Sequence, residues 1–265
     1  MSRGAVRRIG LAVVVLVGAT AGLDATATAA APSLAACPGG PPTIAVDVGH
    51  SLAEPGAISA RGKPEFGFNV ALAHAVAAAL ARAGAWPKLV NEDGATISLG
   101  ERVERINRAH PDLVLSIHHD SVQPQYLQTW TEAGRTLDYS DRFSGFSLFV
   151  SNRNRAAGES RRWAVALGEA LVAAGLTPSL HHAEAIAGEN RPLLDPRLGI
   201  YAFDGLAVLK GAAAPAVLLE GGIIKNRSDE ETLQTAQFRT KVADAVVVAV
   251  GAWCTGSKTA PGRTR

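Results

Sequence analysis

The stretch that decides the fold reads Leu113-Val114-Leu115-Ser116-Ile117, followed directly by His118-His119-Asp120. Its first five residues are apolar except for the serine, which is typical of a strand buried on both faces. Such strands occur in parallel sheets whose two faces are covered by helices. The stretch therefore predicts an α/β fold, and the polar residues after it mark one end of the sheet.

Strand-like and helix-like segments alternate on both sides of this stretch. We expect strands at 43–48, 86–90, 113–117, 146–150 and 216–219, and helices at 66–83, 98–109, 157–174 and 228–250. Ser98 and Glu101 have the spacing of a capping box, and Ser228 is placed to cap the last helix. This order predicts a single domain of the α/β class, with a largely parallel sheet flanked by helices on both faces.

The first 31 residues have the pattern of a secretory signal peptide. Arg3, Arg7 and Arg8 precede an apolar run that ends near Leu23, and small residues follow up to Ala31. The run is about 15 residues long, short of the roughly 20 that span a bilayer, so no stable membrane insertion is expected after the signal is removed. The sequence therefore predicts an exported protein, located in the periplasm or at the cell wall outside the cell.

The rest of the chain divides into three parts, and the second of them contains an insertion. We expect a Pro-, Gly- and Ala-rich linker over 32–42, the folded domain over 43–254, and a disordered polar tail over 255–265. Residues 121–145 show no clear periodicity and are unusually long for a connection. We interpret this segment as an insertion loop over the functional site.

The charge balance gives no sign of a nucleic-acid partner. The whole chain has 26 Lys and Arg against 24 Asp and Glu. Removing residues 1–31 takes away three arginines and Asp24, which leaves 23 of each sign (26 − 3 and 24 − 1). A neutral mature protein lacks the basic surface that nucleic-acid binding requires.

The two cysteines, Cys37 and Cys254, stand near the two ends of the mature chain. In an oxidising compartment such a pair can form a disulfide that closes nearly the whole domain. A different interpretation is that residues 34–37, Leu-Ala-Ala-Cys, form a lipobox whose cysteine is lipid-modified. The apolar run of the leader ends well before this point, with Asp24 and Pro32 between, so we favour the disulfide.

Chemically active side chains gather where the expected strands end. His50 follows the first strand, His118-His119-Asp120 follows another, and Glu220 follows the strand at 216–219. In open α/β sheets, ligands bind beyond the carboxyl ends of the strands. With Glu65 at the start of the first long helix, these residues offer two histidines and a carboxylate, the ligand set of a hydrolytic zinc site, and a second carboxylate to act as general base. Adjacent residues of a strand point to opposite faces, so the residues alone leave open whether His118 or His119 is the ligand.

Five ordered blocks of sequence, spread over about residues 43–233, resemble the zinc-dependent N-acetylmuramoyl-L-alanine amidases of the amidase_3 type. The blocks are Val46-Asp47-Val48-Gly49-His50 with Pro55-Gly56-Ala57, Glu65 with Asn69, Ser98-Leu99 with Glu101-Arg102 and Asn107-Arg108-Ala109, Ser116-Ile117-His118, and Leu218-Leu219-Glu220-Gly221-Gly222-Ile223 with Asn226 and Asp229. Each block alone is a weak signal, but their order makes the set specific.

The resemblance implies a role for each matching residue. His50, Glu65 and His118 match the ligands of one zinc ion, and Glu220 matches the catalytic glutamate. It also implies a single α/β domain with a mixed, mostly parallel sheet. The expected substrate is peptidoglycan or a muropeptide, cut between the lactyl group of N-acetylmuramic acid and L-alanine. We expect a monomer, and the sequence does not identify an activating partner.

Some residues depart from the family pattern or lie outside it. Val48 replaces the usual proline and Ser51-Leu52 the usual glycines, which predicts a changed loop with its ligands intact. We consider Asp120 either a hydrogen-bond partner of a ligand histidine or a strand-end cap. Arg191 is a candidate for binding a substrate carboxylate, because a guanidinium suits that geometry. His181-His182 resembles another metal pair, but adjacent residues diverge, so we expect these histidines at the surface or lining the substrate site instead.

Two other functions are compatible with these residues. A zinc peptidase would use the same side chains to cut within the stem peptide. A non-catalytic module that binds the cell wall would keep the fold without turnover, although the presence of all four candidate residues argues against it.

Overall fold

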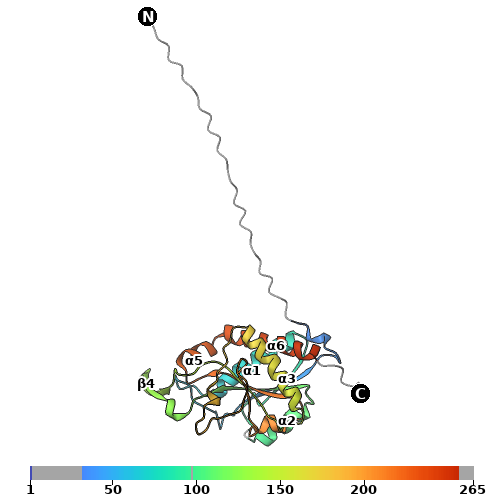
Figure 1. The fold of residues 1–265 in the computed structure, drawn as a ribbon, viewed down its shortest axis with the longest axis horizontal. Helices are drawn as coiled ribbons and strands as arrows, with labels where there is room; N and C mark the ends of the chain where they lie inside the picture. Colours follow the sequence, from blue (N-terminus) through green and yellow to red (C-terminus); the bar gives the residue numbers. More distant parts are fainter. Residues whose placement is uncertain (2–31, 97, 257–265) are drawn as a thin grey trace. The chain divides into compact units, whose positions relative to one another are not determined.

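The computed structural model describes residues 1, 32–96 and 98–256 (Figure 1). The strands are β1 (Thr43–Val48), β2 (Trp86–Val90), β3 (Leu113–Asp120), β4 (Gln128–Glu132), β5 (Arg135–Tyr139), β6 (Ser147–Val150), β7 (Leu193–Asp195), β8 (Ile200–Ala202) and β9 (Ala216–Ile223). The helices are α1 (Glu65–Arg82), α2 (Leu99–Arg108), α3 (Ala157–Ala173), α4 (Ala207–Gly211), α5 (Arg227–Leu233) and α6 (Ala236–Gly256), with short 3-10 turns η1 (Leu34–Ala36), η2 (Pro124–Tyr126) and η3 (His181–Ala183). The expected signal peptide and most of the expected tail lie outside the described residues.

Seven strands form one mixed sheet in the order β2-β1-β3-β9-β6-β8-β7. Neighbours from β2 to β9 are parallel, β6 is antiparallel to β9 and parallel to β8, and β7 is antiparallel to β8. The predicted mixed, mostly parallel sheet is therefore confirmed. In register, Val48 pairs with Ile117 and His118 pairs with Glu220, so the carboxyl ends of β1, β3 and β9 meet at one edge.

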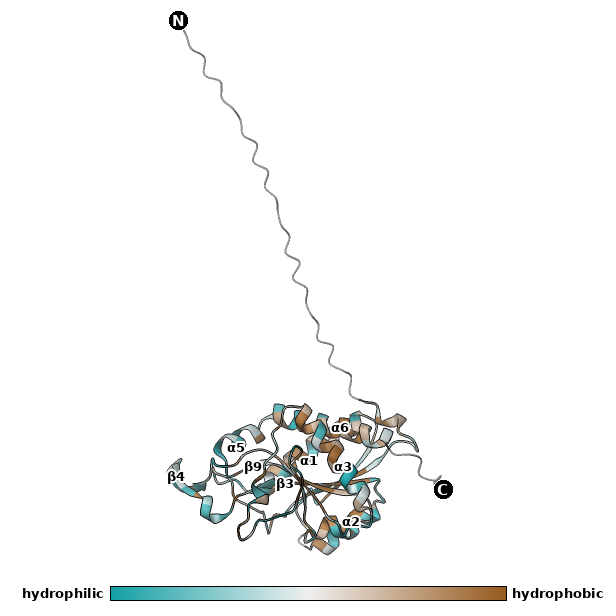
Figure 2. Ribbon diagram, viewed as in Figure 1, coloured by the Kyte–Doolittle hydropathy of each residue, from teal (hydrophilic) through white to brown (hydrophobic). Residues whose placement is uncertain are grey.

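Helices cover both faces of the sheet, as the sequence predicts. Alternate residues of the strands enter two separate apolar clusters, one packed with α1, α3 and α6 and the other with α2 and α4. In β1, Ile44 and Val46 belong to the first cluster and Ala45 to the second. Figure 2 marks the hydrophobic residues of α1, which packs against β1 and β3. This two-sided burial explains why the central strands are almost continuously apolar.

One ion pair is buried between the sheet and α2. The Nε and Nη2 atoms of Arg102 donate to the two carboxylate oxygens of Asp47 at 3.0 and 2.6 Å, and Ser116 Oγ donates to the same carboxylate at 2.7 Å. Asp47 has no exposed surface and Arg102 is 2% exposed. The pair fixes α2 to β1 three residues before His50.

The expected last helix is wrong in detail, because two helices occupy its span. The cap of α5 is Asn226, whose side-chain oxygen accepts from the backbone N–H groups of Ser228 and Asp229 at 2.9 and 3.0 Å. After α5 ends, the hydroxyl of Thr235 accepts from the N–H of Phe238 at 3.1 Å and so begins α6. A second capping residue, Thr235, therefore interrupts the expected helix there.

Residues 32–42 pack onto the domain instead of linking to it. Leu34 is fully buried in the larger apolar cluster, and its N–H donates to Ala83 O at 2.7 Å. Cys37 and Cys254 form a disulfide with their Cα atoms 5.5 Å apart. The Cys37 sulfur is thereby bonded within the chain, which disfavours its lipid modification. Over residues 32–96 and 98–256, no helix has the length and apolar character needed to cross a membrane.

The insertion at 121–145 is ordered and contains the antiparallel hairpin β4–β5. Trp130 Nε1 donates to Ala60 O at 2.9 Å, and the N–H of Ser140 donates to Lys225 O at 2.9 Å. These bonds tie the hairpin to the segment before α1 and to the segment after β9. Trp130 and the backbone of Ser140 therefore hold the insertion to the domain. The strands β4 and β5 have five residues each, too few for their alternation to predict them.

Candidate metal centre

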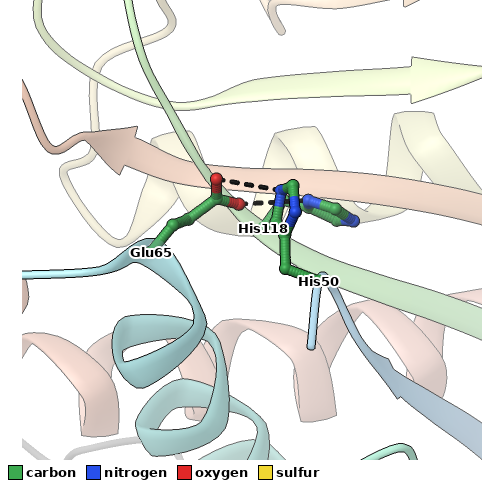
Figure 3. A group of neighbouring side chains, drawn as sticks. All are labelled: His50, Glu65 and His118. Carbon is green, nitrogen blue, oxygen red and sulfur yellow. Dashed lines mark hydrogen bonds and ion pairs between the residues drawn. The ribbon is translucent and has the colours of Figure 1, made fainter. Parts of the chain in front are cut away.

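The side chains of His50, Glu65 and His118 converge at the carboxyl edge of the sheet (Figure 3). His50 Nε2 lies 3.0 Å from one oxygen of Glu65, and His118 Nδ1 lies 3.1 Å from the other. One potential ligand atom from each residue lies within 4.8 Å of those of the other two. The structure thus brings together the three side chains that the sequence selected, from a loop, a helix start and a strand end.

Glu65 is held in place by a set of donors at the start of α1. The N–H of Ala57 donates to Oε2 at 3.1 Å, and Asn69 Nδ2 and the N–H of His119 donate to Oε1 at 3.1 and 3.2 Å. Burial alone would raise the pKa of this carboxyl, but the hydrogen bonds and charges of His118 and His50 outweigh it and hold the pKa well below its usual range. Glu65 is therefore an ionised, oriented carboxylate.

The loop that carries His50 is conformationally demanding. His50 has a φ of 66°, a left-handed conformation that is uncommon for residues other than glycine. Asn91 Nδ2 donates to the carbonyls of Val48 and His50 at 2.9 and 2.6 Å and so fixes the turn. A Cβ at Gly49 would collide with the ring of His118, so the close approach of the loop to β3 requires glycine there.

Glu220 lies directly opposite His118 in the β3–β9 register. Its Oε2 atom is buried and has no hydrogen-bond partner within the described part of the chain. Burial raises the pKa of Glu220 well above its ordinary value, and the negative charges of Asp120 and Glu65 raise it further. A carboxyl with one buried, unpaired oxygen beside a potential metal site is a candidate for moving protons.

The side chain of His119 contacts α1, so of the two adjacent histidines only His118 joins the group with His50 and Glu65. The Nδ1 atom of His119 lies 2.8 Å from Asn69 Oδ1, and its ring centroid is 5.6 Å from that of Phe68 in α1. Burial lowers the pKa of His119 to about 4. His119 thus packs as a neutral side chain between sheet and helix, while His118 meets Glu65.

Three other sequence candidates are found outside this group. Asp120 Oδ2 lies 3.3 and 2.8 Å from Nε2 of His181 and His182, and Asp120 Oδ1 accepts from the N–H of Ser121 at 2.7 Å. Of its two expected roles, the contacts fit the strand-end cap and not a bond to a ligand histidine of the first site. His181 and His182 are 3% and 9% exposed, so their expected surface position is wrong. Arg191 stacks over Phe203, with the guanidinium carbon 3.8 Å from the ring centroid, and its role in substrate binding stays a prediction.

A pocket of about 260 Å³ opens beside the metal group. Its walls combine the polar side chains of His50, Glu54, Arg102 and His118 with apolar residues of α2, α4 and the loop before α4 (Leu99, Leu206, Val208 and Leu209). Sequence reasoning did not identify α4, because its five residues are too few to show helical periodicity.

The donor set fits a zinc ion. Two imidazoles and one carboxylate are the protein ligands of many hydrolytic zinc sites, which leave a further position open. The backbone donors to Glu65 and the space left by Gly49 support those ligands. The fold and this site define an α/β domain with the candidate metal ligands and the candidate proton carrier of a metal-dependent hydrolase.

Residues 44–252 match the family model Amidase_3, described as N-acetylmuramoyl-L-alanine amidase. The chain belongs to this family. It is 26% identical over 223 residues to the N-acetylmuramoyl-L-alanine amidase AmiA of Escherichia coli K12, covering 80% of this chain and 76% of that protein. It is 29% identical over 207 residues to the amidase LytC of Bacillus subtilis 168, covering 77% of this chain and 34% of LytC.

Solved structures share the fold. The N-acetylmuramyl-L-alanine amidase of Mycobacterium smegmatis superposes with a TM-score of 0.64 at 22% identity, covering 85% of this chain and all of that one. The amidase from Clostridium difficile 630 gives a TM-score of 0.63 at 19% identity, covering 82% of this chain and 99% of that one.

Proposed function

We propose that this protein is a zinc-dependent N-acetylmuramoyl-L-alanine amidase that cuts peptidoglycan between the lactyl group of N-acetylmuramic acid and L-alanine. One observation carries the proposal. His50, Glu65 and His118 converge at the strand exits, with the unpaired carboxyl of Glu220 opposite His118. Family membership supplies the class of bond, and this geometry supplies residues able to hydrolyse it.

His50, Glu65 and His118 would hold the metal. A zinc ion bound there supplies a Lewis acid that polarises the amide carbonyl and makes water a better nucleophile. Glu220 Oε2 takes the proton of the attacking water and passes it to the nitrogen of the departing L-alanine. Burial and the charges of Asp120 and Glu65 raise the pKa of Glu220, which makes the carboxylate a stronger proton acceptor than an exposed one.

The pocket beside the metal group is the proposed position of the substrate. It offers apolar walls from α2 and α4, and Arg102 and Glu54 as polar groups. We further propose that Arg191 binds a carboxylate of the stem peptide through the N–H groups at the edge of its guanidinium, while its face stays on Phe203.

We propose that the protein is exported and acts as a monomer at the cell wall. The leader pattern of residues 1–31 supports export, and the disulfide between Cys37 and Cys254 suits an oxidising compartment. The site of action would then be the periplasm or the exterior of the cell, where peptidoglycan lies.

Digestion of purified sacculi tests the proposal. The protein should release stem peptides with a free L-alanine amine and leave an intact lactyl acid, and a chelator should stop the release. Glu220→Gln should lower the rate by about 10²–10⁴-fold because the proton carrier is lost, with metal content unchanged. Glu169→Gln, an exposed change on α3, is the matched control.

Each other outcome would refute a part of the proposal. Fragments cut within the stem peptide would indicate a peptidase. Absence of turnover by a folded, metal-loaded protein would indicate a binding module. Near-normal activity of Glu220→Gln would show that another group carries the proton.

A further inference from the structure

A second group of histidines and a carboxylate lies two residues further along β3. The potential ligand atoms of Asp120, His181 and His182 lie within 4.8 Å of one another. Asp120 ends β3, and the two histidines form the 3-10 turn η3 after α3. The group is thus assembled from segments about 60 residues apart, and none of its members belongs to the first metal group.

The two histidines present the same nitrogen to the same oxygen. His181 Nε2 lies 3.3 Å from Asp120 Oδ2, and His182 Nε2 lies 2.8 Å from it. Two imidazole nitrogens therefore converge on one carboxylate oxygen, and the longer of the two contacts does not form a hydrogen bond. A cation between them would satisfy all three atoms.

The opposite nitrogen of each ring is held by a polar partner. His182 Nδ1 lies 2.8 Å from Glu189 Oε2, and His181 Nδ1 lies 3.0 Å from Ser179 Oγ. Gln123 Nε2 in turn donates to Glu189 at 2.7 Å. Metal-binding histidines are usually oriented this way, with the second nitrogen bonded to a carboxylate or another acceptor.

His181 carries an unsatisfied atom that points into the group. Its side chain is 1% exposed, and Nε2 has no hydrogen-bond partner among residues 32–96 and 98–256. The ring stacks on Phe143, with centroids 5.1 Å apart, and Nε2 lies 3.3 Å from Asp120 Oδ2 without the alignment that a hydrogen bond requires. A buried, unpaired nitrogen is costly unless something binds it.

We propose that Asp120, His181 and His182 bind a second divalent transition-metal ion, with zinc as the best match. Two imidazoles and one carboxylate suit zinc and related cations and leave positions open for water or substrate. Asp120 and His182 keep side-chain exposures of 12% and 11%, which gives the ion a route in. The inference concerns residues outside the first metal group and stands independently of the proposed amidase chemistry.

A metal-free ionic cluster is the competing explanation. Burial lowers the pKa of His182, but Asp120 and Glu189 outweigh burial and raise the pKa to about 9 in the absence of a cation. A charged His182 would then bridge the two carboxylates. That arrangement satisfies His182 but leaves His181 Nε2 without a partner, so the metal accounts for more of the geometry.

Metal counting on the purified, chelator-stripped and zinc-reloaded protein tests the proposal. We expect two equivalents of zinc in the wild type, and one in His181→Ala, Asp120→Asn and His118→Ala. The double variant His118→Ala/His181→Ala should retain none. His74→Ala, which alters a half-exposed histidine on α1, should keep both equivalents.

A second measurement guards against misfolding. Glu189→Gln keeps all three ligands but removes the orienting carboxylate, so zinc affinity at one site should fall about 10–100-fold in a chelator competition assay. One equivalent in the wild type, unchanged by His181→Ala and Asp120→Asn, would overturn the proposal and favour the ionic cluster. Failure of the first site would look different, because His118→Ala would then leave the metal content unchanged.

Discussion

The buried ion pair between Asp47 and Arg102 gives the most quantitative prediction. Arg102→Ala removes two charge-assisted hydrogen bonds, at 3.0 and 2.6 Å, and leaves the Asp47 carboxylate fully buried, with Ser116 as its one remaining donor among the described residues. Breaking a buried pair by deleting one partner costs about 3–5 kcal/mol, because the remaining charge is uncompensated. The free energy of unfolding should fall by that amount.

Denaturant unfolding monitored by far-UV circular dichroism measures this loss. In a thermal scan the same change should lower Tm by about 6–20 °C for a domain of this size. Arg105→Ala, three residues along α2, is the matched control. Its pair with Glu101 is exposed, with side-chain exposures of 40% and 49%, and should be worth only about 0.3–0.5 kcal/mol.

Two results would refute this reasoning. The first is a loss for Arg102→Ala no larger than for Arg105→Ala, which would mean that water or rearrangement satisfies Asp47. The second is a double variant, Asp47→Asn with Arg102→Ala, that is less stable than Arg102→Ala alone. Removing the buried charge should instead restore part of the stability.

Three further predictions test the scaffold around the site. Replacing both Cys37 and Cys254 with serine should cost up to about 5 kcal/mol of unfolding free energy by loop entropy, since the bond closes a separation of 217 residues, and denaturant unfolding without reductant will measure it. Burial lowers the pKa of His119 from 6.5 to about 4, so the unfolded chain takes up a proton at a higher pH than the folded protein does. The contribution of His119 to the free energy of unfolding should therefore be complete above about pH 6.5 and be lost progressively as the pH falls through 4. His119→Gln should flatten that profile, and an equal slope in both proteins would contradict the assignment. Gly56→Ala should weaken zinc binding at least about 10-fold, because φ is +79° and a Cβ would strike the Glu65 carboxylate and the His50 ring. Gly67→Ala is the control: it has open space around it in α1 and should raise the free energy of unfolding by about 0.5–1 kcal/mol.

Local sequence patterns predicted those features that depend on neighbouring residues. The apolar run of β3, the helix expected at 66–83 and the cap at Ser98 follow from periodicity and spacing, and each lies within a residue or a few of its predicted bounds. Patterns shorter than about one helical turn or a few strand residues carried too little signal, which is why the hairpin β4–β5, β7, β8 and α4 were not predicted.

The candidate site divides in the same way. Strand exits and the family resemblance were enough to select His50, Glu65, His118 and Glu220. The partners that orient them come from elsewhere in the chain: Asn91 fixes the His50 turn from the end of β2. Such contacts join residues far apart in the sequence. The pattern of a single sequence does not indicate which distant residues lie close together in the folded protein.

The sequence by itself therefore determined the α/β class, the position of the site at one edge of the sheet and the residue types that build it, because these depend on period and order along the chain. Only the tertiary structure decided that His118 faces Glu65 while His119 packs against α1. It also decided that Asp120 meets His181 and His182 instead of the first metal group. The physical reason is that the direction of a side chain at a strand end depends on the bulge between His118 and Asp120 and on the segments packed against it, and both are set by distant parts of the chain.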